Sequence, residues 1–134
     1  ETAVAVHTNG KVTIWGRHAN KPRPEFDMPS SEKGPFQISS GWNSILMRSN
    51  SGKIYTNRPD RLPRNLPLAV AVRADGDIFA VQKQNLDWFA WGRDYSMGVI
   101  DKINEIGPAA HINYVNWNGL GNLLWIEPVS STSE

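Results

Sequence analysis

Residues 69–78 read AVAVRADGDI, and residues 3–12 carry the same pattern as AVAVHTNGKV. The two stretches align without a gap and are identical at half of their positions. Each is an apolar run, then Asp-Gly or Asn-Gly, then a second run rich in strand-forming residues. Val and Ile favour strands, while Asn, Asp and Gly tolerate the positive φ of a two-residue primed turn. The sequence therefore predicts a β-hairpin that occurs twice.

Three weaker echoes accompany the hairpins. Residues 44–55 (SILMRSNSGKIY) form a third copy with one more residue before its Gly, which predicts a longer or bulged turn. The motif IWGR at 14–17 recurs as AWGR at 90–93, but farther from its hairpin glycine, so we expect an insertion within residues 82–89. GWNSIL at 41–46 is echoed by GLGNLL at 119–124, which predicts a glycine loop that enters a buried strand.

The remaining stretches connect these units. Residues 21–35 and 58–67 are too rich in Pro to be central strands. Apolar spacing at 99–106 predicts about two turns of helix before Gly107-Pro108 ends them. We therefore expect a single mostly-β domain made of antiparallel hairpins, followed by a polar tail at 130–134. Its repeat units would span about 1–37, 38–66, 67–111 and 112–129.

Composition excludes several classes of function. The chain has 134 residues, of which 40% are hydrophobic, and a formal charge of +1, so composition lends nucleic-acid binding no support. The absence of Cys excludes disulfides, zinc–thiolate sites and Cys nucleophiles. A small secreted eukaryotic domain often needs disulfides, so the absence of Cys favours a cytoplasmic or bacterial-secreted protein. No apolar run is long enough to cross a membrane, so we expect no membrane partner, and no signal peptide is visible.

No motif in the sequence indicates catalysis. His7, His18 and His111 lack a paired-ligand spacing, and the carboxylates are scattered. Gly119-Leu120-Gly121 lacks the further glycine of a phosphate loop, and no Ser lies in a nucleophile elbow. The sequence therefore predicts no catalytic residue, no metal site and no cofactor.

The located pieces resemble the repeat of the regulator-of-chromosome-condensation family, which forms seven-bladed β-propellers. ISSGWNSILM at 38–47 is similar to the first half of that repeat, and TNGKVTIWGR at 8–17 to the second half. Residues 90–98 resemble the family's Trp-Gly-Arg…Gly stretch, although YTN at 55–57 stands where Trp-Gly is expected. The resemblance covers about half of the chain. It implies propeller blades and partners such as small GTPases, chromatin or a target enzyme.

Length limits what such a resemblance can mean. A blade needs roughly 50 residues, so this chain would hold two to three blades. We therefore expect a fragment of a larger propeller, one subunit of an oligomeric propeller, or a degenerate β domain that keeps only the hairpins. The start at Glu1, without Met, is typical of a processed or excised piece.

The aromatic residues of the loops provide the candidate site. Trp15 and Trp91 end predicted strands and are interpreted as packing residues. Trp42 and Trp117 lie in Gly/Asn stretches, where an aromatic side chain anchors a partner as readily as it packs. The residues that we expect to bind a partner protein are Arg17, His18, Trp42, Arg93, Asp94, Tyr95 and Trp117.

Other functions stay open at this point. A carbohydrate-binding, lectin-like domain would use the same aromatic residues to stack on sugar rings. A small toxin or hydrolase domain would use His111 or His18 near a carboxylate. The basic, Pro-rich loops at 21–24 and 58–64 are interpreted as solvated because the total charge is close to zero.

Overall fold

A computed structural model describes residues 2–16, 26–32, 34–42, 44–93, 98–117 and 121–129. For residues 2, 16, 26, 115–117 and 121–123 it describes the backbone alone. The described residues are mostly β and form antiparallel sheets of two or three strands, so the predicted fold class is confirmed. No helix among them is long and apolar enough to cross a membrane.

The described strands form three sheets and one hairpin, taken in chain order. The first sheet contains β1 (Thr2–Val6), β2 (Lys11–Gly16) and β3 (Phe26–Asp27). The second sheet contains β4 (Gln37–Ser40), β5 (Ile45–Arg48) and β6 (Ile54–Thr56). The third sheet contains β7 (Ala69–Asp75), β8 (Ile78–Lys83) and β9 (Trp88–Gly92). The last hairpin pairs β10 (His111–Trp117) with β11 (Gly121–Glu127).

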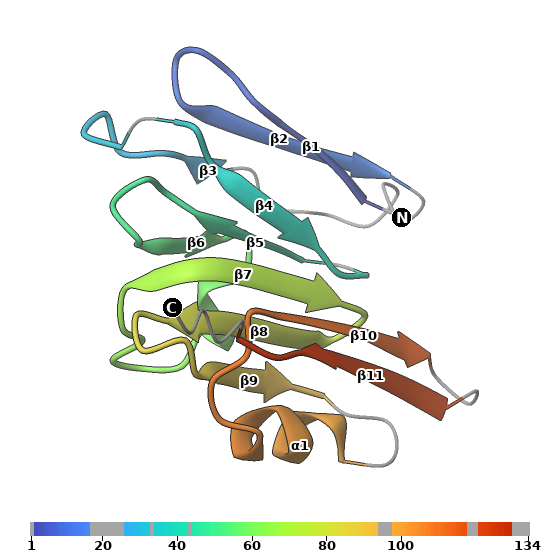
Figure 1. Ribbon diagram of the computed structural model, residues 1–134. Coiled ribbons are helices and arrows are strands. Elements are labelled where there is room, and N and C mark those ends of the chain that lie inside the picture. Colours follow the sequence, from blue (N-terminus) through green and yellow to red (C-terminus); the bar gives the residue numbers. More distant parts are fainter. Residues whose placement is uncertain are drawn as a thin grey trace.

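These sheets follow one another in space as they do in the chain (Figure 1). Among the described residues, the first apolar cluster joins the first and second sheets, for instance through Val12 and Ile45. The next cluster joins Leu46 of the second sheet to Phe79 and Val81 of the third. The last cluster joins the third sheet to the last hairpin and to a helix. Each of these three apolar cores thus lies between two parts of the fold that follow each other in the chain.

The helix α1 (Val99–Glu105) lies where the apolar spacing predicts it. Val99 and Ile103 are buried in the cluster that joins the third sheet to the last hairpin. Tyr114 of β10 is buried in the same cluster, and its hydroxyl donates to the carbonyl oxygens of Ile78 (2.8 Å) and Arg73 (3.0 Å). Burial raises the pKa of Tyr114 well above its ordinary value of 10.0, so the hydroxyl keeps its proton.

The first hairpin turn differs from the prediction. The amide of Gly10 donates to the carbonyl of His7, and the amide of His7 donates to Lys11, both at 2.9 Å, so the turn has three residues instead of two. Gly10, with φ of 89°, is the left-handed residue that such a bulged turn requires. The third copy makes the same two bonds, at Ser49 with Gly52 and Lys53, which confirms its predicted bulge. The two-residue turn occurs between β7 and β8, with Gly76 at φ of 56°.

The insertion predicted within residues 82–89 is wrong. Leu86 and Asp87 bond Lys83 as Gly10 and Lys11 bond His7, so β8 and β9 are joined by a third turn of the same kind. The hairpin that corresponds to β1–β2 is therefore β8–β9, with Trp15 and Trp91 at matching positions of β2 and β9. The extra residues are a complete strand and its turn. Sequence identity alone had aligned β1–β2 with β7–β8.

The second sheet shows why its copy lacks Trp-Gly. Under the same alignment of turns, buried Asn57 stands where the other two sheets have Trp15 and Trp91. Its side-chain oxygen accepts the backbone N–H of Ile45 at 2.9 Å. The amide thus satisfies a buried donor that a Trp ring would leave unpaired.

Candidate functional site

Strands β4, β7 and β10 point in the same direction, so their carboxyl ends lie on one side of the molecule, here called the rim (Figure 1). The turn after β4 contacts the turn after β7, because the amide of Trp42 donates to the carbonyl of Gly76 at 3.0 Å. A Cβ at Gly41 would overlap that same carbonyl oxygen. Close approach of the two turns therefore explains the glycine that precedes Trp42.

The end of β9 meets the rim in the same way. The amide of Arg93 donates to the carbonyl of Asp77 at 2.9 Å. Gly92 has φ of 120°, and a Cβ there would overlap the Asp77 oxygen. The Gly of Trp-Gly-Arg is thus required by the turn between β7 and β8, which lies against it.

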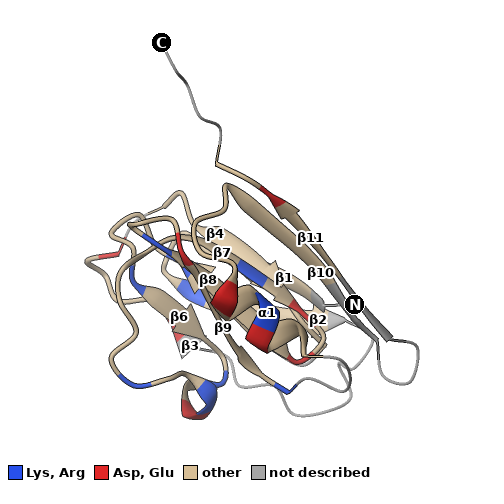
Figure 2. Ribbon diagram, turned by 60° about the horizontal axis from the view of Figure 1, so that its bottom comes forward, with Lys and Arg blue, Asp and Glu red and all other residues tan. Residues whose placement is uncertain are grey.

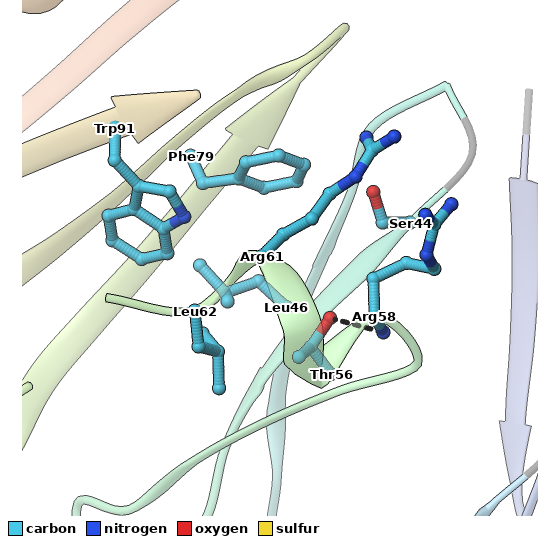
Figure 3. A pocket seen from close by; sticks show the side chains of 8 residues that line it. All are labelled: Ser44, Leu46, Thr56, Arg58, Arg61, Leu62, Phe79 and Trp91. Atoms are coloured by element: carbon cyan, nitrogen blue, oxygen red, sulfur yellow. Dashed lines mark hydrogen bonds between the residues drawn. The ribbon is translucent and has the colours of Figure 1, made fainter. Parts of the chain in front are cut away.

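A groove of about 310 Å³ opens at this point of the rim. We call it the rim groove; its lining residues are Arg61, Asp77, Phe79, Trp91, Gly92 and Arg93. They come from the 3₁₀ turn η1 (Pro59–Arg61), the turn between β7 and β8, the strands β8 and β9, and the residue directly after β9. A small crevice with room for no more than a water molecule continues from it toward Ser44 and Leu46 of the second sheet (Figure 3).

Aromatic rings form the floor of the rim groove. The centroid of the Trp91 ring lies 6.0 Å from that of Phe79 and 5.8 Å from that of Phe89, with which it stacks. Phe79 is buried and Trp91 is half-buried, and both belong to the core between the second and third sheets. The floor is therefore held by the same packing that holds the two sheets together.

Arginine side chains border this apolar floor. Arg61 extends from η1 past Phe79 toward Ser44 (Figure 3). Its guanidinium lies 3.9 Å from the carboxylate of Asp77, which is only 14% exposed, whereas the Arg61 side chain is 45% exposed. Arg93, the residue directly after β9, is exposed. Arg58 lines the adjoining crevice and forms an ion pair with Asp60 at 3.5 Å. The border thus presents more positive than negative charge to a ligand.

Among the described residues outside the rim groove, the charges are mixed. Figure 2 shows Lys and Arg interspersed with Asp and Glu along the described part of the chain, for instance on α1. Such a distribution differs from the basic stripe typical of nucleic-acid binding. The excess of arginine at the rim groove is therefore a local feature.

The predicted site residues that the structure describes are few. Trp42 is half-buried in the turn after β4, and Arg93 is exposed beside the rim groove. Trp117 was expected in a loop, but it ends β10 and pairs with Gly121, because the hairpin extends farther than the Gly/Asn pattern indicates. Residues 17, 18, 94 and 95 lie outside the described part of the chain, so Arg17, His18, Asp94 and Tyr95 stay predictions.

Sequence reasoning missed other residues of the rim groove. Arg61 lies in the Pro-rich loop that is interpreted from the sequence as solvated, and Asp77 is one of the carboxylates that the sequence shows only as scattered. Trp91, interpreted as a packing residue, both packs and lines the groove. The sequence does contain a basic loop and a Trp-Gly-Arg motif, but nothing in it indicates that the two lie side by side in the fold.

The described histidines lie apart from the rim groove. The Nε2 atom of His7 hydrogen-bonds the Thr13 hydroxyl at 2.8 Å, and His111 is exposed at the start of β10. Among the described residues, no group of three or more His, Cys, Asp or Glu side chains could hold a metal ion. The rim groove itself combines aromatic rings, guanidinium groups and one carboxylate, which suits binding.

No protein-family model, no curated protein and no solved structure matches this chain. Its function therefore has to be argued from its own residues.

Proposed function

We propose that this chain is a protein-interaction module of propeller-like β type, which binds a partner protein through the loops of the rim. The observation that carries the proposal is the rim groove, with Trp91 and Phe79 as its floor and Arg61 and Arg93 at its border. Trp and Arg are, together with Tyr, enriched among the residues that dominate binding energy in protein interfaces. Loops on a rigid sheet scaffold are also the usual place for such residues.

The arrangement of the sheets supports the propeller-like part of the proposal. Successive antiparallel sheets share apolar cores, and the turns after β4 and β7 contact each other at the rim. The same bulged turn recurs in all three sheets. Together with the resemblance of residues 8–17 and 38–47 to a propeller repeat, this favours blades over an unrelated β architecture.

The chemistry of the rim groove limits the kind of partner. An apolar side chain of the partner would cover the exposed part of Trp91. An Asp or Glu beside it would meet Arg61 and Arg93, whose guanidinium groups bind carboxylates with two parallel hydrogen bonds. We therefore expect a partner segment in which an apolar residue adjoins an acidic one.

Charge reversal at the border tests the proposal. Partners captured from a lysate of the source cells by the wild-type chain would be identified, purified and titrated by calorimetry against Arg61→Glu and Arg93→Glu. We expect each variant to bind at least about tenfold more weakly, which corresponds to about 1.4 kcal/mol. Arg64→Glu is the matched control, because Arg64 is exposed in the same loop but does not line the groove.

Two outcomes would count against the proposal. If Arg61→Glu, Arg93→Glu and Arg64→Glu bind every purified partner as the wild type does, the rim groove is not the interface. If the chain instead binds a glycan array, and loses that binding in Trp91→Ala, the lectin-like alternative replaces the protein-binding function. Circular dichroism of each variant would verify that it is folded.

A further inference from the structure

The two ends of the row of sheets each expose a tryptophan. Among the described residues, the most exposed large apolar side chains are Trp125, at 56%, and Trp15, at 48%. Trp15 lies on β2 in the first sheet, and Trp125 lies on β11 in the last hairpin. Figure 1 shows these two elements toward opposite ends of the row.

Trp15 belongs to the face of the first sheet that points away from the second sheet. Val4, Val6, Val12 and Ile14 lie on the inner face and contribute to the core with the second sheet. Side chains alternate along a strand, so the other face carries Ala3, Ala5, Thr13 and Trp15, which we call the head face. In the register of the sheet, Ala3 pairs with Trp15 and Ala5 pairs with Thr13.

The other two sheets bury the face that corresponds to the head face. Alignment of the bulged turns places Ile45 and Met47 of β5, and Phe79 and Val81 of β8, at the positions of Ala3 and Ala5. Ile45 and Met47 are buried against the first sheet, and Phe79 and Val81 against the second. In both cases the preceding sheet in the row covers this face. Within the described part of the chain, no sheet precedes the first one.

The last hairpin likewise has one face that packs on its neighbours and one face that points away from them. Ile112, Tyr114 and Leu124 face the third sheet and α1, where they contribute to the last core. Trp125 pairs with Asn113 on the other face, which we call the tail face. Exposed Glu127 shares the tail face with Trp125, while exposed Lys11 and its cross-strand neighbour Asp27 share the head face with Trp15.

We infer that copies of this chain associate head to tail, with the tail face of one copy packed on the head face of the next. The last hairpin would then precede the first sheet of another copy, just as each sheet precedes the next within one chain. Trp125 would pack on the floor of small side chains formed by Ala3 and Ala5. Such a heterologous contact builds a ring if the rotation closes and a filament if it does not.

Self-association of purified protein tests the inference. Light scattering and sedimentation velocity, over a wide range of protein concentrations, should show the wild-type chain forming assemblies larger than a monomer. Trp15→Asp and Trp125→Asp should each weaken self-association by at least about tenfold, because each removes one half of the contact. Leu68→Asp is the matched control: Leu68 is 47% exposed but belongs to neither face, so this variant should associate as the wild type does.

A mixture of the two variants distinguishes head-to-tail contact from other modes. Trp15→Asp keeps an intact tail face, and Trp125→Asp keeps an intact head face, so the mixture should form a one-to-one dimer and nothing larger. Formation of that dimer also demonstrates that both variants are folded. A wild-type chain that stays monomeric at every concentration would overturn the inference. A Trp15→Asp variant that associates as the wild type does would overturn it as well.

Discussion

The third sheet and the first sheet use the same hairpin in different surroundings. In β8 the residues from Ile78 to Gln82 are all buried, because cores lie on both sides of the third sheet. In β1, Ala3 to Val6 are all half-buried, because only one side of the first sheet has a core among the described residues. The turn that follows each strand has the same hydrogen bonds. Local sequence thus determines the hairpin, whereas its neighbours determine how much of it is buried.

The largest test of this difference compares Phe79 with Trp15, which lie on corresponding faces of their sheets. Phe79→Ala removes a buried ring from the core between two sheets, so we expect the free energy of unfolding to fall by about 3–5 kcal/mol. Trp15→Ala, measured where the chain is monomeric, should change stability by less than about 1 kcal/mol, because this ring is half-exposed. Urea denaturation followed by circular dichroism measures both. Equal losses would mean that the head face is covered within one chain.

Gly92 tests whether contact between elements, and not the turn itself, requires glycine. Gly92→Ala should destabilise the chain by about 3 kcal/mol, because the new Cβ would overlap the carbonyl of Asp77 at a φ of 120°. Gly98 also has a positive φ, but within the described part of the chain no atom of a neighbouring element lies within 4 Å of a Cβ there. Gly98→Ala should therefore cost only the conformational strain, about 1 kcal/mol. The two melting temperatures would be compared; similar shifts would refute the role of the contact.

Tyr114 tests the attachment of the last hairpin to the third sheet. Tyr114→Phe removes a buried hydroxyl that donates to the carbonyls of Ile78 and Arg73, which should cost about 1–2 kcal/mol at pH 7. Because the folded state raises the pKa of Tyr114 above its ordinary value of 10.0, the associated stability is complete below pH 10 and is lost as the pH rises above it. Stability curves of the two proteins should therefore converge above pH 10. Parallel curves would indicate that the hydroxyl is not held in this way.

The smallest expected effect concerns Leu86, which lies in a bulged turn with the same hydrogen bonds as two other turns but stands where they have glycine. Leu86 has φ of 74°, where the corresponding residues of the other bulged turns are Gly10 and Gly52. A branched side chain is strained in the left-handed region. Leu86→Gly should therefore raise the free energy of unfolding by about 0.5–1 kcal/mol. Gly10→Leu is the reciprocal variant and should lower it; a loss of stability in Leu86→Gly would mean that packing of this side chain outweighs the strain.

Local patterns predicted those parts of the fold that depend on a few adjacent residues. The runs around Gly10, Gly52 and Gly76 predicted hairpins, because strand preference and positive φ are properties of single residues. Apolar spacing in the same way predicted α1. The length of the first turn was not predicted, nor was the turn that separates β9 from β8, because identity between residues 3–12 and 69–78 outweighed the weaker match between β1–β2 and β8–β9. Asn85 and Leu86 do not spell the Asn-Gly that marks such a turn.

By itself, the sequence determined that this chain is a β protein built from repeated hairpins, since turns and strands follow from local backbone preferences. The tertiary structure decided which face of each hairpin is buried, because burial needs a neighbouring sheet that can lie far away in the chain. It also decided the rim groove: Arg61, Asp77 and Trp91 come from separate loops and strands and meet only when two sheets pack together. The same packing leaves Trp15 and Trp125 exposed at the two ends, where the next neighbour would bind.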